Sequence, residues 1–414
     1  IISIKSKSKM KNAFSILFLL FSVFTFSQNQ EIGQNFLEIL LKEKNFEKAI
    51  TFLDASIKDQ ITVDLLSKTS AQLDAQLGAY QNTISVTDKG SVFSYYTQFK
   101  NMALDFDVRF KEDKIVGFFL KQHQEISTND YKIKSGTIDL KGTLLEAESS
   151  KVLVVFIHGS GPNDRDETVG PNKPFKDMAD AFQKEGIASY RFDKRTRSNP
   201  ETFSNESTFD DEVINDIVNI VAHFRLNEKY KNHQIILLGH SLGAHLMPRI
   251  LNLVKVDKAI MMAGNARGLD EVVIDQYVYL NSLHPSKEGE QEVENVSKKV
   301  KFLHSKAFDL KATNDQLPLE ISAHYWQALL NYKPQIEVKK VTIPLLVLNG
   351  ERDYQVTMKE FALWKKALKN TKAQFISYPK LNHLFIAGEG KPNPEEYSVK
   401  GEVDKKVIQD LILF

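Results

Sequence analysis

Apolar positions in the first part of the chain recur first with a helical and then with a strand-like period. Between residues 34 and 52 their spacing is roughly helical, which predicts a helix there. From Leu104 to Phe110 they alternate with charged residues, and a second apolar run follows the turn at residues 111–114, the pattern of an antiparallel hairpin. A helix followed by a hairpin predicts a small α+β domain over residues 28–125.

The second part of the chain has short apolar runs separated by helix-like segments. The runs lie at residues 152–157, 187–192, 235–238, 259–263 and 344–348. This alternation is typical of a mostly parallel sheet with helices on both faces, so we expect an α/β domain over residues 130–414. The interval between the last two runs, about 80 residues, is too long for a simple crossover. Its charged, helix-prone segment at about 265–337 is predicted to be a helical cap.

An apolar run also lies close to the beginning of the sequence. Residues 13–26 are apolar, Lys11 precedes them, and small and polar residues follow, which is the pattern of a secretory signal peptide over residues 1–27. The run is shorter than the roughly 18 residues that span a bilayer, so an uncleaved membrane anchor is the weaker interpretation. We therefore expect an exported protein, periplasmic or extracellular, with no membrane attachment after cleavage.

The composition limits the partners and the chemistry. Hydrophobic residues make up 42% of the 414 residues, and 54 basic against 53 acidic side chains leave a formal net charge of +1. No overall field would attract nucleic acid or an anionic membrane, so we expect a small-molecule partner. The lack of cysteine excludes disulfides, thiolate metal sites and a cysteine nucleophile. We predict no metal site.

The strongest chemical motif is Gly239-His240-Ser241-Leu242-Gly243, which follows an apolar strand and precedes a helix-like segment. This is G-x-S-x-G in the strand-turn-helix context that a serine nucleophile requires, because the flanking glycines let neighbouring backbone approach a strained turn. The pentapeptide alone also occurs in ordinary strand-helix turns. Its context favours Ser241 as the nucleophile.

A serine nucleophile needs a base and an acid that orients the base. Asp353 follows the apolar run 344–348 in a tight turn, and His383 follows a shorter strand at 374–378, in the chain order Ser, Asp, His of this type of hydrolase. Glu351 is a nearby alternative to Asp353, and a surface loop position is the simpler interpretation of both Asp353 and His383. We predict Asp353 as the acid and His383 as the base.

A loop rich in small residues, His158-Gly159-Ser160-Gly161-Pro162, follows the apolar run 152–157. Its small residues leave backbone N–H groups free to face a substrate carbonyl, so we predict that the amides of Ser160 and Leu242 form the oxyanion hole. The alternative is a glycine-rich loop that only permits a turn. The G-x-G here is too short for a dinucleotide-binding motif.

Polar and charged residues extend this loop and the end of the next strand. They could line a polar pocket or pair with one another, and pairing is the favoured interpretation for most of them. The set comprises Asn163, Asp164, Arg165, Asp166, Asp193, Lys194, Arg195 and Arg197.

Six ordered motifs resemble secreted bacterial α/β-hydrolases of the esterase, dienelactone-hydrolase and serine-aminopeptidase-like group. They are HGSGPNDRD, GPNKPF, YRFDKRT, GHSLGAH, GERDYQVT and LNHLFIAGEG. The resemblance covers roughly residues 136–414. It implies the α/β-hydrolase fold, carboxylesterase activity on small acyl esters, no cofactor, and a triad at Ser241, Asp353 and His383. The preceding segment is similar to a small domain of unknown function that often stands before such hydrolases.

This sequence departs from the family pattern at Ala244-His245, where small or apolar residues are usual. We expect His245 on the first helical turn after the nucleophile, in the substrate cleft. It joins His158, Gly159 and His240 as a candidate pocket residue.

Two other functions stay open. The same triad serves peptidases, and an acidic pair in the cap would hold a peptide amino terminus. Glu290, Glu292 and Glu294 are candidates, although a solvated helix face is the simpler interpretation. The second alternative is a non-catalytic binding protein on a hydrolase scaffold, with the N-terminal domain as the interacting module. The complete triad argues against it, so ester hydrolysis through an acyl-enzyme is the preferred hypothesis.

Overall fold

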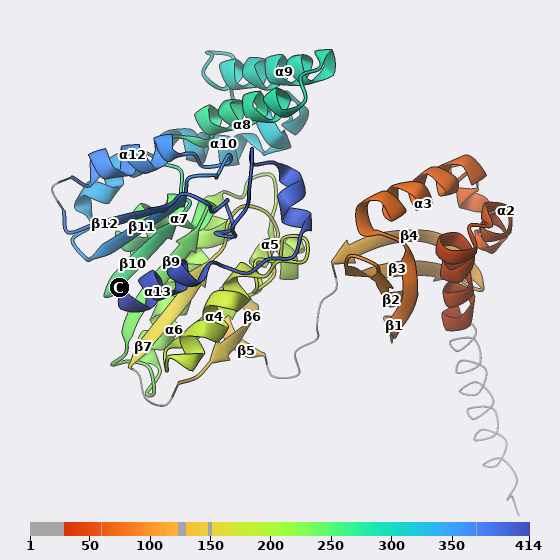
Figure 1. Cartoon of the computed structure of the whole chain (residues 1–414), viewed down its shortest axis with the longest axis horizontal. Helices are drawn as coiled ribbons and strands as arrows, with labels where there is room; N and C mark the ends of the chain where they lie inside the picture. Colours follow the sequence, from red (N-terminus) through yellow and green to blue (C-terminus); the bar gives the residue numbers. More distant parts are fainter. Residues whose placement is uncertain (1–28, 59, 123–129, 148–150, 370) are drawn as a thin grey trace, which may run out of the picture. The chain divides into compact units, whose positions relative to one another are not determined.

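The computed structural model describes residues 29–58, 60–122, 130–147, 151–369 and 371–414. The chain divides into two compact units, and the boundary lies between residues 127 and 128 (Figure 1). The predicted signal peptide, residues 1–27, lies outside the described residues. No helix in the described part of the chain is long and apolar enough to cross a bilayer.

The N-terminal unit contains an antiparallel sheet, which in the described residues has four strands in sequential order. The strands are β1 (Tyr80–Asp88), β2 (Val92–Phe99), β3 (Ala103–Lys111) and β4 (Lys114–Gln122). The predicted hairpin is confirmed as β3 and β4, in which Phe106 pairs with Leu120. Strands β1 and β2 were not predicted, because most β1 side chains are polar and exposed and give no apolar alternation.

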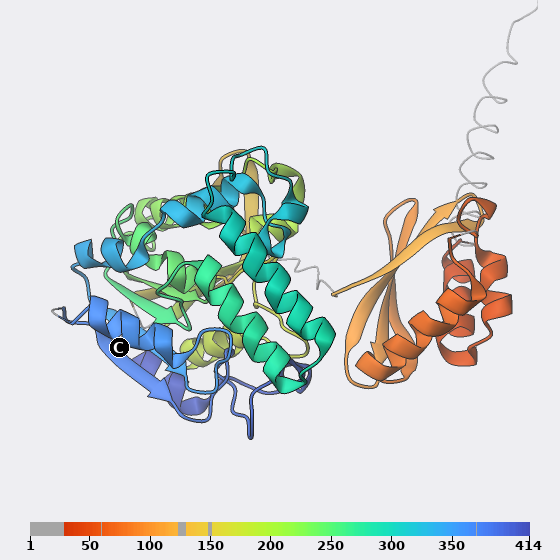
Figure 2. The same cartoon turned by 90° about the horizontal axis from the view of Figure 1, so that it is seen from above.

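The helices of this unit lie on one face of the sheet (Figures 1 and 2). They are residues 29–37, the π-helix η1 (Glu38–Glu43), α2 (Phe46–Ala49) and α3 (Val63–Leu77). The single helix predicted for residues 34–52 is interrupted, because Lys44 adopts a left-handed φ of 54° and the Asn45 side chain caps α2 by accepting from Lys48 N. Phe36 is buried and packs against Phe118 of the sheet, with ring centroids 5.3 Å apart.

The second unit is built on a mixed sheet, which in the described residues has eight strands in the order β12-β11-β10-β9-β7-β8-β6-β5. Strands β7 to β12 are parallel, and β6 runs antiparallel to β8. The strands are β5 (Tyr131–Ser135), β6 (Ile138–Leu145), β7 (Val152–Ile157), β8 (Ala188–Phe192), β9 (Gln234–His240), β10 (Lys258–Met262), β11 (Leu345–Gly350) and β12 (Gln374–Tyr378). The predicted apolar runs are confirmed as β7 to β11. The β5–β6 hairpin was not predicted.

Helices cover both faces of this sheet, as predicted. Alternate residues of β7 show the two cores: Val154 and Phe156 pack with α4 and α13, whereas Leu153 and Val155 face the core that contains α6, α7 and α12. The covering helices are α4 (Pro174–Lys184), α6 (Asn215–Leu226) preceded by the π-helix η5 (Asp210–Ile214), α7 (Leu242–Leu251), α12 (Met358–Ala367) and α13 (Lys405–Leu413).

A group of helices between β10 and β11 occupies the interval predicted as a cap. The helices are α8 (Leu269–Leu283), α9 (Lys287–Leu303), α10 (Ala323–Asn331) and α11 (Pro334–Glu337). Helices α8 and α9 run side by side (Figure 2) and share a small apolar cluster of Val273, Val296 and Val300. The Tyr332 hydroxyl donates to the His245 carbonyl over 2.8 Å and ties the end of α10 to α7.

Short helical turns complete the described chain. They are η2 (Ile50–Phe52), η3 (Ala55–Ile57), α5 (Arg195–Ser198), η4 (Pro200–Thr202), η6 (Asn314–Gln316), η7 (Pro318–Glu320), η8 (Val338–Lys340) and η9 (Pro394–Ser398).

Candidate active site

Ser241 occupies the turn between the end of β9 and the start of α7. Its φ of 51° and ψ of −113° lie in a region that non-glycine residues rarely adopt, so the turn is strained. A Cβ on Gly239 would stand 2.6 Å from the carbonyl carbon of Gly243, so this close crossing of backbone requires glycine. The Ser241 side chain is half-buried. This is the local geometry of a nucleophile elbow.

The predicted acid and base form a buried pair. The Nδ1 of His383 lies 2.6 Å from the Oδ2 of Asp353, and the two residues are 5% and 3% exposed. The Oδ1 of Asp353 accepts from the backbone N–H groups of Gln355 and Val356, at 2.8 and 2.9 Å. The carboxylate is thus held in one orientation, which leaves the Nε2 of His383 for chemistry. Glu351 is exposed and accepts from the Ser377 hydroxyl instead.

His240 brings the base loop next to the nucleophile. It directly precedes Ser241, and its Nε2 donates to the backbone carbonyl of His383 over 2.9 Å. The rings of His240 and His383 are 4.7 Å apart between centroids. In the described residues no hydrogen bond joins Ser241 Oγ to His383, a contact that in hydrolases without substrate is often long and shortens in the complex.

The loop after β7 passes over the nucleophile. A Cβ on Gly159 would lie 3.1 Å from the Cβ of Ser241, which places the Gly159–Ser160 backbone beside it. Among the described residues, the N–H groups of Ser160 and Leu242 have no acceptor. Leu242 N–H is also the first amide of α7, where the helix dipole favours negative charge. The two predicted oxyanion donors are therefore free, and the Gly159–Ser160 loop borders Ser241.

The histidines proposed as pocket residues are buried. His245 is 2% exposed, its Nδ1 donates to the Asn265 carbonyl over 2.8 Å, and its ring packs edge-on against Tyr332. The expectation that His245 lies in an open substrate cleft is therefore wrong, because α10 and its following residues cover the imidazole. Burial lowers the pKa of His245 to about 4.

His158 is also buried, between aromatic rings rather than in a cleft. Its ring lies 4.9 Å from that of Phe192 and 5.3 Å from that of Phe175, measured between centroids. Burial lowers the pKa of His158 to about 4, so the side chain is neutral near pH 7. Of the four candidate pocket residues, Gly159 and His240 lie beside the nucleophile, and His158 and His245 support it from within the core.

Glu167 is a buried carboxylate that sequence reasoning missed. Its Oε1 accepts from Gly159 N–H over 2.5 Å, and its Oε2 lies 3.0 Å from the Nδ1 of His240. Burial by itself would raise the pKa of Glu167, but the positive charge of His240 lowers it. Burial likewise would lower the pKa of His240, but Glu167 raises it. The only available signal was the acidic run that continues the HGSGPNDRD motif to Glu167.

Pairing is confirmed for most of the charged residues near this loop, although several of their partners lie outside the predicted set. Arg165 bonds Asp193 and Asp130, and Arg191 pairs with Asp166. Two further buried pairs are Lys194 with Glu212 and Arg195 with Asp216. The Arg165–Asp193 pair joins the loops after β7 and β8. The pairs of Lys194 and Arg195 join the segment after β8 to η5 and α6.

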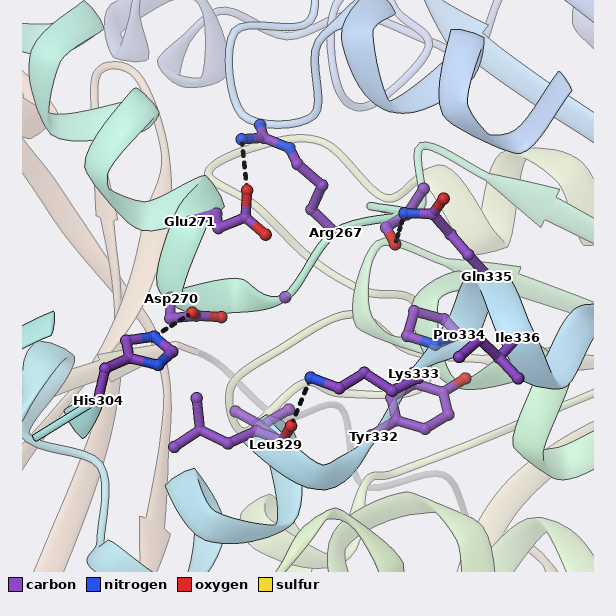
Figure 3. A pocket seen from close by; sticks show the side chains of 13 residues that line it. Arg267, Asp270, Glu271, His304, Leu329, Tyr332, Lys333, Pro334, Gln335 and Ile336 are labelled. Carbon is purple, nitrogen blue, oxygen red and sulfur yellow. Dashed lines mark hydrogen bonds and ion pairs between the residues drawn. The ribbon is translucent and has the colours of Figure 1, made fainter. Parts of the chain in front are cut away.

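A cavity of about 480 Å³ lies between the loop after β10 and helices α8, α10 and α11 (Figure 3). Ion pairs occupy part of its wall: Arg267 reaches Glu271, and His304 contacts Asp270 at 2.8 Å (Figure 3). None of Ser241, Asp353 and His383 lines it. In the described part of the chain, no cluster of His, Asp and Glu could hold a metal ion.

A strained serine at a strand-helix turn, a buried Asp–His pair and free amide donors, all at the carboxyl edge of a mostly parallel sheet, define a serine hydrolase of the α/β-hydrolase fold. The chain belongs to the family described as Serine aminopeptidase, S33, whose sequence model matches residues 148–389. The predicted resemblance to the α/β-hydrolase group is thereby confirmed.

Individual proteins also resemble this chain. It is 34% identical over 394 residues to Esterase EstD of Thermotoga maritima, a match that covers 90% of this chain and 92% of that protein and so extends over both units. Similar solved structures include Est1E from Butyrivibrio proteoclasticus, with 13% identity, a TM-score of 0.43, and coverage of 69% of this chain and 98% of that one. Another is proline iminopeptidase of Mycobacterium smegmatis, with 12% identity, a TM-score of 0.45 and the same two coverages.

Proposed function

We propose that this protein is a carboxylesterase that hydrolyses small esters through an acyl-enzyme. The observation that carries the proposal is the buried Asp353–His383 pair, joined through His240 to the strained turn of Ser241. A relative of similar length named an esterase supports an ester substrate. Ser241 is assigned as nucleophile, His383 as base and Asp353 as the orienting acid.

The proposed reaction uses these groups in two half-reactions. His383 Nε2 takes the Ser241 hydroxyl proton as Oγ attacks the ester carbonyl, and the amides of Ser160 and Leu242 receive the oxyanion. His383 then returns the proton to the leaving alcohol as the C–O bond breaks. Water attacks the acyl-enzyme in the same way, which releases the carboxylic acid and restores Ser241.

The test uses short p-nitrophenyl esters graded in acyl length. Ser241→Ala is expected to lower kcat by a factor on the order of 10⁶ with an unchanged melting temperature, because the nucleophile is lost and the fold is not. A fluorophosphonate probe should label the wild type at Ser241 and leave the Ser241→Ala variant unlabelled. Turnover by Ser241→Ala at the wild-type rate would refute the assignment.

A peptidase is the second candidate, since the family is described as a serine aminopeptidase. The cap residues Glu290, Glu292 and Glu294 are all exposed on α9, which favours a solvated helix face over a site for a peptide amino terminus. Aminoacyl p-nitroanilides compared with esters of equal size separate the two activities: a higher kcat/KM for the anilides would favour the peptidase. A non-catalytic binding protein would show no probe labelling at all.

We propose further that the protein is exported, on the basis of the apolar residues 13–26 preceded by Lys11. Expression of the full chain in a bacterial host, followed by cell fractionation and mass spectrometry of the amino terminus, tests this. Cleavage after Ser27 with activity outside the cytoplasm is expected. An uncleaved, cytoplasmic product would contradict export.

A further inference from the structure

The backbone of Gly159 is held from both sides by buried charged side chains. Its N–H donates to Glu167, and its carbonyl oxygen accepts from the Nζ of Lys194 over 2.7 Å. The Nδ2 of Asn163 also donates to this oxygen, at 3.2 Å. Lys194 is 1% exposed and comes from the segment after β8, so this contact crosses between two loops.

The contact at the Gly159 carbonyl orients a different group, the N–H of Ser160. The carbonyl of one residue and the N–H of the next belong to one planar trans peptide and point in opposite directions. No peptide in the described residues is cis. A donor that fixes the Gly159 oxygen on one side therefore turns the Ser160 N–H to the other side, where it has no acceptor among the described residues and is free for the proposed oxyanion.

Lys194 is itself fixed by partners outside its own loop. Its ammonium pairs with the Oε1 of Glu212 at the start of the α6 segment. The Oε2 of Glu212 accepts from the hydroxyl of Tyr325 over 2.5 Å, and Tyr325 is a buried residue of α10 in the cap. The chain of contacts runs from the cap through Glu212 and Lys194 to the Gly159–Ser160 peptide.

We propose that Lys194 is a positioning residue that pre-orients the Ser160 amide of the oxyanion hole through the Gly159 carbonyl, with Glu212 and Tyr325 holding the ammonium in place. The inference rests on the proposed hydrolase function of Ser241. Lys194 touches no reacting atom. Its effect is expected in stabilisation of the transition state and not in substrate binding, because the oxyanion exists only after attack on the carbonyl.

The test compares Lys194→Met/Glu212→Gln with the single variant Glu212→Gln. Replacing both charges keeps similar volumes and leaves no unpaired buried charge, so the fold should persist. In the single variant the new amide oxygen at position 212 can still accept from the Nζ of Lys194, which keeps this donor on the Gly159 carbonyl. Relative to it, the double variant should lose about 10- to 100-fold in kcat, a part of what loss of one oxyanion donor costs, with KM within twofold.

A second readout separates positioning from a general structural effect. A trifluoromethyl ketone forms a tetrahedral adduct with Ser241 whose oxyanion occupies the hole, whereas the matching methyl ketone mimics bound substrate. The double variant should bind the trifluoromethyl ketone more weakly by the same factor as kcat falls, with unchanged affinity for the methyl ketone. Equal weakening of both ketones, or kcat within twofold of Glu212→Gln, would overturn the inference.

Stability and the ester assignment are controlled separately. If the double variant melts far below the wild type, Lys194→Leu/Glu212→Gln takes its place, because leucine also lacks a donor for the Gly159 carbonyl, and the same outcomes apply. The rate of fluorophosphonate labelling needs no known substrate. If the wild type hydrolyses no ester, the ester proposal fails, whereas labelling of the double variant at the rate of Glu212→Gln refutes only the role of Lys194.

Discussion

Two buried carboxylate–histidine pairs lie close to Ser241, and the histidine of one contacts the histidine of the other. In the Asp353–His383 pair one ring nitrogen faces the acid, and the other accepts a proton from serine in the proposed reaction. In the Glu167–His240 pair the second nitrogen already donates to the His383 carbonyl. The same two side-chain types therefore serve a base that changes its protonation in one pair and a fixed support in the other. The difference lies in the partner of Nε2, the ring nitrogen that does not face the carboxylate.

Within these two pairs, the largest expected loss of activity comes from Asp353→Asn. The backbone donors of Gln355 and Val356 hold the oxygen of an amide at the Oδ1 position, so its NH₂ group must face His383. His383 Nδ1 then has to accept, the proton sits on Nε2, and the ring cannot take a proton from Ser241. We expect kcat to fall by about 10⁴ with little change in melting temperature, measured by ester hydrolysis and calorimetry. A loss below tenfold would show that Asp353 does not set the tautomer.

The free energy of unfolding should change most when the Glu167–His240 pair is broken. Glu167→Ala removes the acceptor of Gly159 N–H and the counter-charge of His240, both buried. We expect a loss of about 3 to 5 kcal/mol in the free energy of unfolding, from urea denaturation at pH 7. Glu351→Ala is the matched control, an exposed carboxylate close to Asp353 that should cost less than about 1 kcal/mol. Equal losses in the two variants would mean that the Glu167 pair adds nothing.

The two pairs also show how far the sequence predicts the site. Ser241 and Asp353 could be placed because they follow apolar runs that form the buried strands β9 and β11. His383 follows β12, a shorter and mostly half-buried strand at the edge of the sheet. The roles of Glu167 and Lys194 were not predicted, because they depend on contacts with backbone atoms of Gly159, which no side-chain pattern encodes.

The fold shows the same division. The strands β7 to β11 are nearly continuous apolar runs, since both faces of the sheet are covered. The hairpin of β5 and β6 lies at the edge of the sheet, and its exposed Lys132 and Lys134 break any apolar run. For His245 the sequence predicted a position in the substrate cleft, but the residue is buried. That prediction came from its position on the first turn after Ser241, and only the packing of Tyr332 shows that the residue is covered.

His245 tests what a carboxylate partner does for a buried histidine, because it pairs with a carbonyl instead. Its pKa is about 4 when folded and near 6.5 when unfolded, so the unfolded chain binds more protons between these values. Its contribution to stability is present above pH 6.5 and is lost as the pH falls toward 4, by at most about 3 kcal/mol.

His245→Asn removes this titration and keeps an N–H donor for the Asn265 carbonyl. The fall in unfolding free energy between pH 7 and pH 4 should be smaller in the variant than in the wild type by up to about 3 kcal/mol, followed by urea denaturation at each pH. At pH 7 the variant should be slightly less stable, because the smaller side chain packs less well against Tyr332. Parallel pH profiles for the two proteins would argue that the pKa of His245 is the same in the folded and the unfolded protein.

The smallest effect is expected from Glu167→Gln, the same acid-to-amide change that is most damaging at Asp353. Gly159 N–H holds the amide oxygen at the Oε1 position, so the NH₂ group faces the Nδ1 of His240. His240 then becomes neutral with its proton on Nε2, which is the tautomer that donates to the His383 carbonyl. All contacts are kept, and we expect kcat within about tenfold of the wild type. A loss near that of Asp353→Asn would mean that the charge on His240, and not its orientation alone, assists the reaction at Ser241.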